Sequence, residues 1–487
     1  MIIRNKTLIT LLYLALELAP CYSLNVQVPF FLNHHPSLEQ QNTLQLKTIY
    51  HHGSANGPIP KLFRRLELPQ TAQKFSLKSK QGVMDRPSTA DRNDLLLKMS
   101  QSNDRLVRWS TVAGEDKQYR AMQLESTIGI LPDVTDRESI VSLAQMSNNA
   151  YLDIDLNNTE WYDLGSSWHL NNSFGWESDG LRGHLFANQD ESLIVIGIKG
   201  TSGGLWTGGP TGEKDKINDN MLFSCCCARI SRAWSPVCDC YQGNEYKCES
   251  SCLQEKISKA ELYYDNALAI YKDAQDKYKN STIWLTGHSL GGAIASLVGI
   301  TFGVPTVTFE IPGDMLASER LHLPKGPGID LPVWHFGHTA DPIFVGVCNG
   351  PSSSCWYGGY AMETRCHTGK VCVWDTVKDN GWRVDIRSHR VRDVIDGILM
   401  KPEEFPLPNC VEEKDCQDCG LWEYYDDRDP VKTGTTSLAT STTDAATSTT
   451  DAATSTTDNV TTITLTTTAD TRPSTTIHEP PTDPWPN

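Results

Sequence analysis

The ten residues 284–293, Trp-Leu-Thr-Gly-His-Ser-Leu-Gly-Gly-Ala, constrain the fold of this chain more than any other stretch. The apolar residues at their start are typical of a buried strand, and the small and apolar residues that follow are typical of a closely packed helix. Gly287 and Gly291 flank Ser289, at positions where a side chain would collide with the neighbouring strand or helix. The spacing therefore predicts a nucleophile elbow, a sharp strand-to-helix turn that exposes the Ser289 hydroxyl.

Strand-like and helix-like segments alternate around this turn. Apolar runs typical of buried strands occur at 183–186, 193–198, 304–309 and 333–336. Asp136 can cap one helix, and Ser258 and Glu261 have the spacing of a capping box that opens another, running to about Tyr278. This alternation predicts an α/β-hydrolase fold, with a doubly wound and mostly parallel sheet, over residues 136–400.

A serine nucleophile needs a base within hydrogen-bond reach and a carboxylate that orients the base, and this fold supplies them in the order Ser, Asp, His. The acid should follow a strand downstream of the elbow. Asp341 follows the strand-like run 333–336, whereas Asp314 and Asp330 lie among Pro and Gly with no strand directly before them. Asp341 is therefore the predicted acid of a catalytic triad.

The histidine should lie just before a helix near the end of the domain. His389 precedes an apolar face at helical spacing. The rival candidates are His335 and His338, which are close to the predicted acid, and His367, which lies among cysteines. His389 is the predicted base.

An oxyanion hole needs two backbone N–H groups directed at the developing negative charge. One is expected from Leu290, at the start of the helix after the serine. The second should come from the loop after the strand 193–198, where Thr201 is the candidate and its hydroxyl can add a hydrogen bond. Ester hydrolysis at such a site needs no cofactor, and no residue pattern predicts a metal.

The charge of the chain and its first residues bear on its location. A net charge of −16 over 487 residues argues against nucleic acid as a partner. Residues 1–24 carry Arg4 and Lys6 before an apolar segment interrupted by Glu17, which predicts a cleaved signal peptide or a membrane anchor. Positive charge before this segment favours a cytosolic N-terminus and a lumenal remainder in either case.

The cysteines support a lumenal location. One of the fifteen, Cys21, lies in the apolar segment, and the others form groups of seven, four and three at 225–252, 348–372 and 410–419. Two of these groups are odd, so complete pairing needs at least one disulfide between groups. Zinc is the less favoured alternative for residues 225–252, because their spacing fits no regular pair of Cys-x-x-Cys motifs. We interpret 225–252 as a disulfide-bonded insertion that forms part of a cap over the active site.

The remaining segments are predicted from composition. Residues 25–135 form an N-terminal lumenal extension and 401–433 a cysteine-containing linker. Residues 434–487 are rich in Thr, Ser, Ala and Asp and contain a seven-residue repeat, Thr-Ser-Thr-Thr-Asp-Ala-Ala, that places Asp444, Asp451 and Asp458 in register. The repeat lacks the apolar positions of a coiled coil, which predicts a disordered, O-glycosylated tail. Sequons for N-glycosylation occur at Asn157, Asn171, Asn280 and Asn459.

Several motifs resemble a known family. The run Gly-His-Ser-Leu-Gly-Gly at 287–292 is similar to the elbow of class 3 (fungal triacylglycerol) lipases. Most of residues 45–400 resembles one branch of these enzymes, the fungal vacuolar lipases that break down autophagic bodies. The segments that carry this resemblance are 51–53, 64–66, 122–126, 136–146, 180–184, 199–201 and the triple cysteine 225–227.

This resemblance implies a single-pass type II membrane glycoprotein that travels through the endoplasmic reticulum, Golgi and multivesicular bodies to the vacuole lumen. It implies hydrolysis of triacylglycerol, phospholipid or both in the membranes of intravacuolar vesicles, with phosphoinositides among the candidate lipids. It also assigns catalytic roles to Ser289, Asp341 and His389.

Two alternatives belong to other functional classes. An esterase of the secretory pathway that acts on another substrate would use the same triad, so the motifs do not separate it from a lipase. A non-catalytic cell-surface mannoprotein would explain the Ser/Thr-rich tail and the sequons. A lipid-anchored surface protein is expected to end in an apolar tail, whereas this chain ends in Trp-Pro-Asn.

Overall fold

The computed structural model describes residues 39–53, 62–68, 74–102, 107–113, 120–151, 180–201, 212–229, 235–243 and 245–426. Contacts divide the chain into residues 1–430 and 431–487, and the second unit lies outside the described residues. The predicted membrane segment 1–24, the tail 434–487 and the sequons at Asn157, Asn171 and Asn459 also lie outside them. Among the described residues, no helix combines the length and apolar character needed to cross a membrane.

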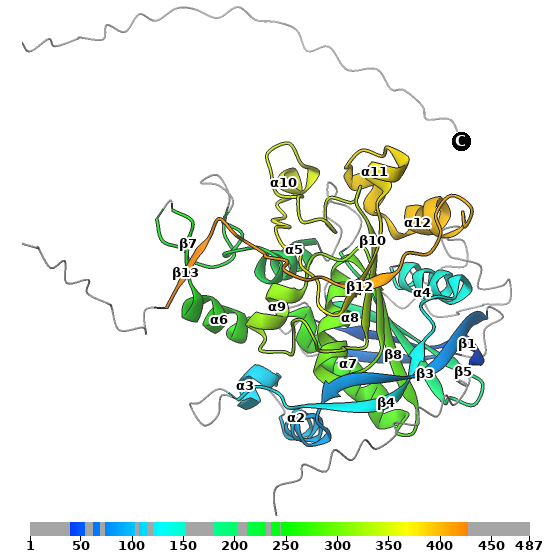
Figure 1. Cartoon of the computed structure of the whole chain (residues 1–487). Helices are drawn as coiled ribbons and strands as arrows, with labels where there is room; N and C mark the ends of the chain where they lie inside the picture. Colours follow the sequence, from blue (N-terminus) through cyan, green and yellow to red (C-terminus); the bar gives the residue numbers. More distant parts are fainter. Residues whose placement is uncertain are drawn as a thin grey trace, which may run out of the picture. The chain divides into compact units, whose positions relative to one another are not determined.

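Eleven strands of the described residues form one sheet, in the order β12-β11-β10-β9-β8-β6-β5-β1-β3-β4 with β2 paired to β1 (Figure 1). The strands are β1 (Gln40–His52), β2 (Phe63–Glu67), β3 (Phe75–Pro87), β4 (Leu124–Pro132), β5 (Leu181–Asn188), β6 (Leu193–Ile198), β8 (Thr282–His288), β9 (Thr306–Phe309), β10 (Val333–His338), β11 (Lys370–Trp374) and β12 (Cys410–Glu412). The four apolar runs read as strands in the sequence correspond to β5, β6, β9 and β10.

The sheet has a parallel part and an antiparallel part. β6, β8, β9, β10 and β11 are parallel to one another, whereas β5, β1, β3 and β4 pair antiparallel. Within residues 136–400 the sheet is mostly parallel, as expected. β5 is the antiparallel exception in this range, because residues 189–192 that join β5 to β6 are too few for the crossover that a parallel pair requires. The sheet also continues across residue 136, since β1 pairs with β5, so the predicted extension contributes strands to the same sheet.

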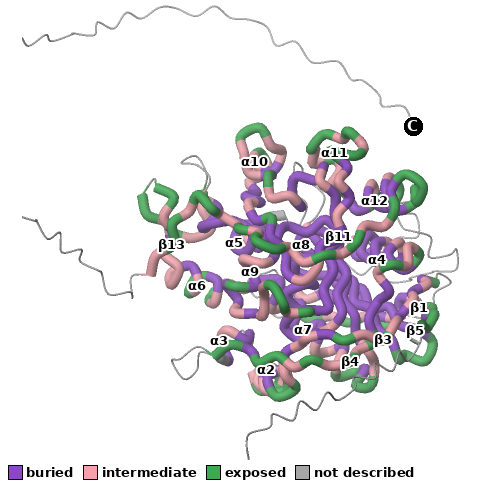
Figure 2. Tube along the Cα trace, viewed as in Figure 1, coloured by how far each residue is buried: buried purple, intermediate pink, exposed green. Residues whose placement is uncertain are grey.

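Helices cover both faces of the sheet and create two apolar cores. The helices are α2 (Thr89–Gln101), α3 (Trp109–Ala113), α4 (Arg137–Asn149), α5 (Gly212–Leu222), α6 (Ser250–Lys259), α7 (Tyr263–Lys277), α8 (Ser289–Phe302), α9 (Met315–Arg320), α10 (Ser354–Gly358), α11 (Thr376–Asn380) and α12 (Val391–Val394), with the short turns η1 (Ile386–His389) and η2 (Ile395–Leu399). Alternate residues of β6 face opposite cores: Ile196 packs with α7 and α8, and Val195 packs with α4. Buried residues accordingly concentrate along the central strands and α8 (Figure 2).

The helix before the elbow begins later than predicted. The structure ends α6 at Lys259 and begins α7 at Tyr263, so the capping box expected at Ser258 is wrong. The Ser258 hydroxyl instead donates to the backbone oxygen of Glu255, inside α6. The Asp265 carboxylate accepts the backbone N–H of Leu262 at 2.8 Å and caps α7. The helix predicted after Asp136 is confirmed, since α4 begins at Arg137 with the Asp136 carboxylate accepting from Ser139.

The described cysteines form seven disulfides, and three of these connect the groups seen in the sequence. The bridges are Cys225–Cys419, Cys226–Cys248, Cys227–Cys238, Cys240–Cys252, Cys348–Cys355, Cys366–Cys416 and Cys372–Cys410. The prediction of at least one disulfide between groups is therefore confirmed. All seven cysteines of 225–252 are paired, in agreement with the disulfide interpretation of this segment.

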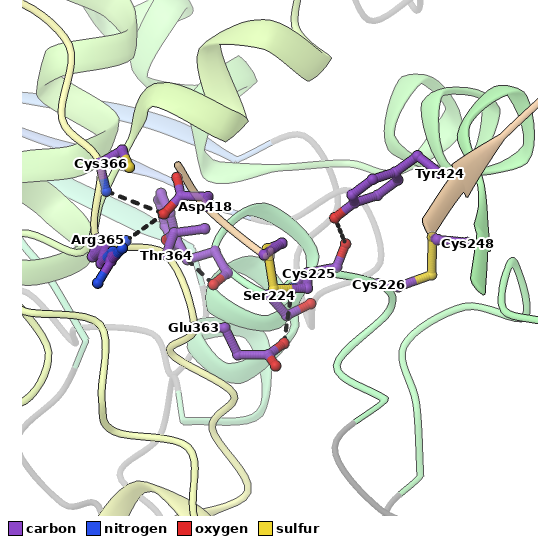
Figure 3. Close-up of a disulfide and its surroundings, with 12 residues drawn as sticks. Ser224, Cys225, Cys226, Cys248, Glu363, Thr364, Arg365, Cys366, Asp418 and Tyr424 are labelled. Atoms are coloured by element: carbon purple, nitrogen blue, oxygen red, sulfur yellow. Dashed lines mark hydrogen bonds between the residues drawn. A yellow bond between two sulfur atoms is a disulfide. The ribbon is translucent and has the colours of Figure 1, made fainter. Parts of the chain in front are cut away.

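Residues 410–426, here called the C-terminal clasp, pack against the domain, unlike the linker that the sequence predicts. β12 joins the main sheet, and β13 (Glu423–Tyr425) pairs with β7 (Lys247–Glu249) of the cysteine-rich segment. Figure 3 shows the polar contacts around the Cys225–Cys419 disulfide: Tyr424 donates to the backbone oxygen of Cys225, and Asp418 accepts the backbone N–H of Arg365. Covalent bonds and hydrogen bonds together fix this segment.

Candidate active site

The turn at Ser289 has the geometry of a nucleophile elbow. β8 ends at His288, α8 begins at Ser289, and Ser289 itself has a φ of 55°, a conformation that is uncommon for residues other than glycine. A Cβ at Gly287 would lie 2.7 Å from the backbone of Gly291, and one at Gly291 would lie 2.3 Å from the backbone oxygen of Ile198. Glycine at both positions thus allows β8, α8 and the end of β6 to approach one another closely.

The structure brings Ser289, His389 and Asp341 together from three separate elements. His389 Nε2 lies 2.8 Å from Ser289 Oγ, and His389 Nδ1 lies 2.7 Å from Asp341 Oδ2. The carboxylate partner places the imidazole proton on Nδ1, so Nε2 is free to accept the serine proton. Ser289 begins α8, Asp341 follows β10, and His389 ends η1, immediately before α12. This arrangement can activate a hydroxyl for nucleophilic attack.

Asp341 is completely buried and well supplied with hydrogen bonds. Its Oδ1 accepts the backbone N–H of Ile343 at 2.9 Å, while Oδ2 faces His389. Burial raises the pKa of Asp341, but the nearby His389 imidazole and its hydrogen bond outweigh burial and hold the pKa below its ordinary value. The carboxylate therefore remains ionised and able to orient His389.

The rival acids have other partners. The Asp314 carboxylate is buried and accepts hydrogen bonds from the Ser296 hydroxyl and from the backbone N–H of Thr368. Asp330 forms an ion pair with Lys370 at the molecular surface. Neither carboxylate contacts Ser289 or His389 through these bonds, so we assign both a structural role.

The rival histidines are also held by structural contacts. The two ring nitrogens of His335 contact Thr308 Oγ1 and the backbone oxygen of Thr368, at 2.7 and 2.6 Å. His367 Nδ1 lies 3.4 Å from a Glu413 carboxylate oxygen. His338 is closer to the triad, because its Nε2 donates to the backbone oxygen of Ser388 at 3.2 Å, next to His389.

The candidate oxyanion loop lies against the start of α8. The backbones of Lys199 and Gly200, directly before Thr201, pack closely against Gly291. A Cβ atom on residue 291 would lie within 2.5 Å of both. The Thr201 hydroxyl donates to Asp219 Oδ2 of α5 at 2.8 Å. Burial raises the pKa of Asp219 well above its ordinary value and so favours the neutral form of this carboxyl. The sequence did not single out Asp219, because only the fold places α5 beside this loop.

Two further residues, His288 and Tyr151, support the candidate triad and were missed by sequence reasoning. His288 Nε2 donates to the backbone oxygen of His389 at 2.7 Å, and its Nδ1 lies 2.7 Å from the Tyr151 hydroxyl. Burial lowers the pKa of His288 to about 3, which keeps the ring neutral. His288, the residue before Ser289, therefore holds the backbone of His389 in place. Its place in the elbow motif was the available signal, whereas the contact with Tyr151 depends on the fold.

Among the predicted glycosylation sites, Asn280 is the one that the structure describes. It is exposed in the turn after α7, where a glycan would meet solvent.

Comparison with known proteins agrees with this geometry. The family model described as "Lipase (class 3)" matches residues 236–305, which include the elbow. A Saccharomyces cerevisiae protein described as "Putative lipase ATG15" is 42% identical to this chain over 428 residues, which cover 80% of this chain and 81% of the relative. The chain belongs to the ATG15 family of fungal lipases. The class 3 lipase resemblance seen in the sequence is thereby confirmed.

For some relatives, the region shared with this chain covers only part of the relative's length. The ATG15 relative from Vanderwaltozyma polyspora is 50% identical over 319 residues, which cover 64% of this chain and 56% of the relative. The chain thus spans little more than half the length of that protein. Among solved structures, the match to the Lip2 lipase of Yarrowia lipolytica covers 49% of this chain and 80% of the Lip2 chain. The sequence identity is 16% and the TM-score is 0.26, so this match is not used to assign the fold.

Proposed function

We propose that this chain is a serine lipase that hydrolyses the carboxylic esters of triacylglycerol, of phospholipid, or of both. The observation that carries the proposal is the pair of contacts made by His389, 2.8 Å to the Ser289 hydroxyl and 2.7 Å to the Asp341 carboxylate. Membership of the ATG15 lipase family supports lipid esters as the substrate class.

The proposed reaction follows from the positions of these groups. Ser289 Oγ attacks the ester carbonyl carbon while His389 Nε2 accepts the hydroxyl proton, and Asp341 stabilises the imidazolium that forms. The backbone N–H groups of Leu290 and Thr201 are the proposed donors to the oxyanion. His389 then protonates the leaving alcohol, and an acyl group remains on Ser289. Water activated by His389 releases the fatty acid and restores the serine.

The proposed location is the vacuole lumen, where the enzyme would lyse autophagic bodies and the vesicles delivered by multivesicular bodies. The seven disulfides support a route through an oxidising secretory compartment. In this proposal residues 1–24 anchor a type II membrane protein, and its partners are the lipids of intravacuolar vesicles, phosphoinositides among them.

The test is hydrolysis by the purified full-length protein in three parallel assays: phosphatidylcholine vesicles, a trioleoylglycerol emulsion and a soluble short-chain ester. The proposal predicts fatty-acid release from at least one of the two lipid substrates, and no release by the Ser289→Ala variant. Hydrolysis of the soluble ester alone would favour the esterase alternative. An inactive wild-type protein with normal folding would contradict both.

A further inference from the structure

A second carboxyl group, that of Glu310, lies behind the triad and takes no part in the mechanism above. Glu310 directly follows β9, the strand between β8 and β10, and is completely buried. Its φ of 47° lies in the left-handed region, as does the φ of 55° at Ser289 after the adjacent strand. Glycine would adopt this conformation with less strain, so a buried acidic residue here indicates that the side chain has a role.

The hydrogen bonds of Glu310 leave part of its carboxyl unsatisfied. Oε2 accepts the backbone N–H of His338 at 3.3 Å. Oε1 lies 3.8 Å from His338 Nε2, which donates to Ser388, and among the described residues no donor reaches Oε1. The same carboxyl contacts the carboxyl of Asp341. Two carboxyl groups attract each other only when one carries a proton, so this contact requires a proton on either Glu310 or Asp341.

The hydrogen-bond partners decide which carboxyl holds the proton. Asp341 accepts from His389 Nδ1 and from the Ile343 backbone, at 2.7 and 2.9 Å, and these donors favour its ionised form. Glu310 has the single, longer contact with His338. Burial raises the pKa of Glu310 well above its ordinary value, and the adjacent Asp341 charge and hydrogen bond raise it further. Two adjacent buried carboxyls do not both ionise, so Glu310 is the neutral member.

We propose that Glu310 is a positioning residue, a neutral carboxylic acid that donates a hydrogen bond to Asp341 and holds the Asp341 carboxylate against His389. The proposal rests on the proposed function, because it concerns the same triad. It assigns to the end of β9 a role that complements the nucleophile at the end of β8 and the acid after β10.

A pH effect follows from the groups that face this pair. Three side chains face the Asp341 carboxylate: those of His389 in η1, of His338 at the end of β10 and of Glu310 at the end of β9. The charge of Asp341 also affects the pKa of His288. The hydrogen bond from Glu310 is one of the contacts that hold the pKa of Asp341 below its ordinary value. A group with a lowered pKa loses its charge when the pH falls through that value. Removal of the donor therefore raises the pKa of Asp341, and activity in acid is lost at a higher pH.

The test compares two substitutions in the full-length protein. Glu310→Gln keeps a neutral hydrogen-bond donor at all pH values, whereas Glu310→Gly removes the donor and suits the backbone conformation. The Gln variant is expected to retain kcat/KM within about threefold, and the Gly variant to lose about 10- to 100-fold, as expected for a misplaced catalytic group. The acid limb of the pH–activity profile should move to higher pH in the Gly variant alone.

Three results would overturn the proposal. If Gln loses as much activity as Gly, the site needs a charged Glu310, and if Gly keeps both wild-type activity and the wild-type profile, the side chain positions nothing. The third readout does not depend on activity: at pH 7 the infrared carbonyl absorption of protonated carboxylic acids should be weaker by one group in the Gln variant than in the wild type, while any contribution from Asp219 stays the same. No such difference would contradict a neutral Glu310, even if the protein hydrolysed no lipid and the proposed function itself had failed.

Discussion

The catalytic edge of the sheet and the cysteine-rich region are stabilised in different ways. At the ends of β8, β9 and β10, buried hydrogen bonds and a fully buried α8 hold Ser289, Asp341 and His389. The cysteine-rich region pairs β7 with β13, strands of three residues each, and disulfides connect it to the domain. A large sheet can fix charged groups by packing and hydrogen bonds, whereas elements this short bury too little apolar area and need covalent bonds.

The largest effect is expected from the nucleophile. Ser289→Ala should lower lipid hydrolysis by about 10⁴- to 10⁶-fold while the melting temperature stays near that of the wild type, because the elbow accommodates a smaller side chain. Ser296→Ala is the matched control in the same helix, since its hydroxyl contacts Asp314 rather than His389. It should lose stability and keep activity. Comparable activity in the two variants would show that Ser289 is not the nucleophile.

The second effect separates a catalytic from a structural carboxylate. Asp341→Asn should reduce kcat by about 10⁴-fold, because the amide no longer favours the required tautomer and charge of the histidine. Asp314→Asn removes an equally buried carboxylate that contacts Ser296 and Thr368, so it should lower the melting temperature with little change in kcat. Steady-state kinetics gives kcat and thermal unfolding gives the melting temperature of both variants. The assignment of the acid fails if Asp314→Asn is the less active of the two.

The third prediction concerns stability in acid. Burial lowers the pKa of His335 to about 4, so the unfolded chain binds a proton there first as the pH falls. Stability should therefore decrease from about pH 6.5 downwards and level off near the folded pKa, and His335 alone contributes about 3 kcal/mol of this decrease. Denaturant unfolding of His335→Asn at several pH values should give a shallower dependence.

His367 provides a control of opposite sign. Burial lowers its pKa, but the hydrogen bond and charge of Glu413 outweigh burial and raise it. Its contribution is therefore complete at low pH and is lost as the pH rises through the folded value. His367→Asn should therefore remove a decrease in stability above about pH 6.5 and leave the dependence below that pH unchanged. Equal slopes for the two variants would be inconsistent with these assignments.

The smallest effect on activity is expected from the clasp. Replacement of Cys225 and Cys419 by Ala opens a loop with a sequence separation of 194 and should lower the unfolding free energy by about 2 to 4 kcal/mol. Below the melting temperature, kcat/KM should change by less than about tenfold, since triad loss alone costs far more. Removal of Cys348–Cys355, with a separation of 7, is the control and should destabilise less. The contrast between the two regions is refuted if clasp removal abolishes activity in a folded protein.

The convergence of the three residues of the proposed triad could be predicted from the sequence because each occupies a position with a local signature. Ser289 lies between glycines, Asp341 follows a strand, and His389 precedes an apolar helical face. Their convergence also depends on parallel strands that end at one edge of the sheet. Glu310 follows β9 as Asp341 follows β10, so the same strand-end rule applied to every strand would have identified it.

Other parts depend on contacts that no local pattern encodes. Tyr151 reaches His288 across 137 positions, and the sheet creates this contact. The odd numbers of cysteines in two of the groups required at least one disulfide between groups. These numbers did not identify the partners, because many different pairings meet that requirement. The late start of α7 was missed because the Ser258 hydroxyl binds the preceding helix, a choice that the spacing of Ser258 and Glu261 does not reveal.

The most direct test of the account is the location of the acyl group during turnover. Full-length protein mixed with phospholipid vesicles or a triacylglycerol emulsion is quenched in acid before steady state, digested and analysed by mass spectrometry. The account predicts a fatty acyl ester on the peptide that contains Ser289, and none in the Ser289→Ala variant. Fatty-acid release by the wild type with the acyl group on another residue, or unchanged release by the variant, would contradict it.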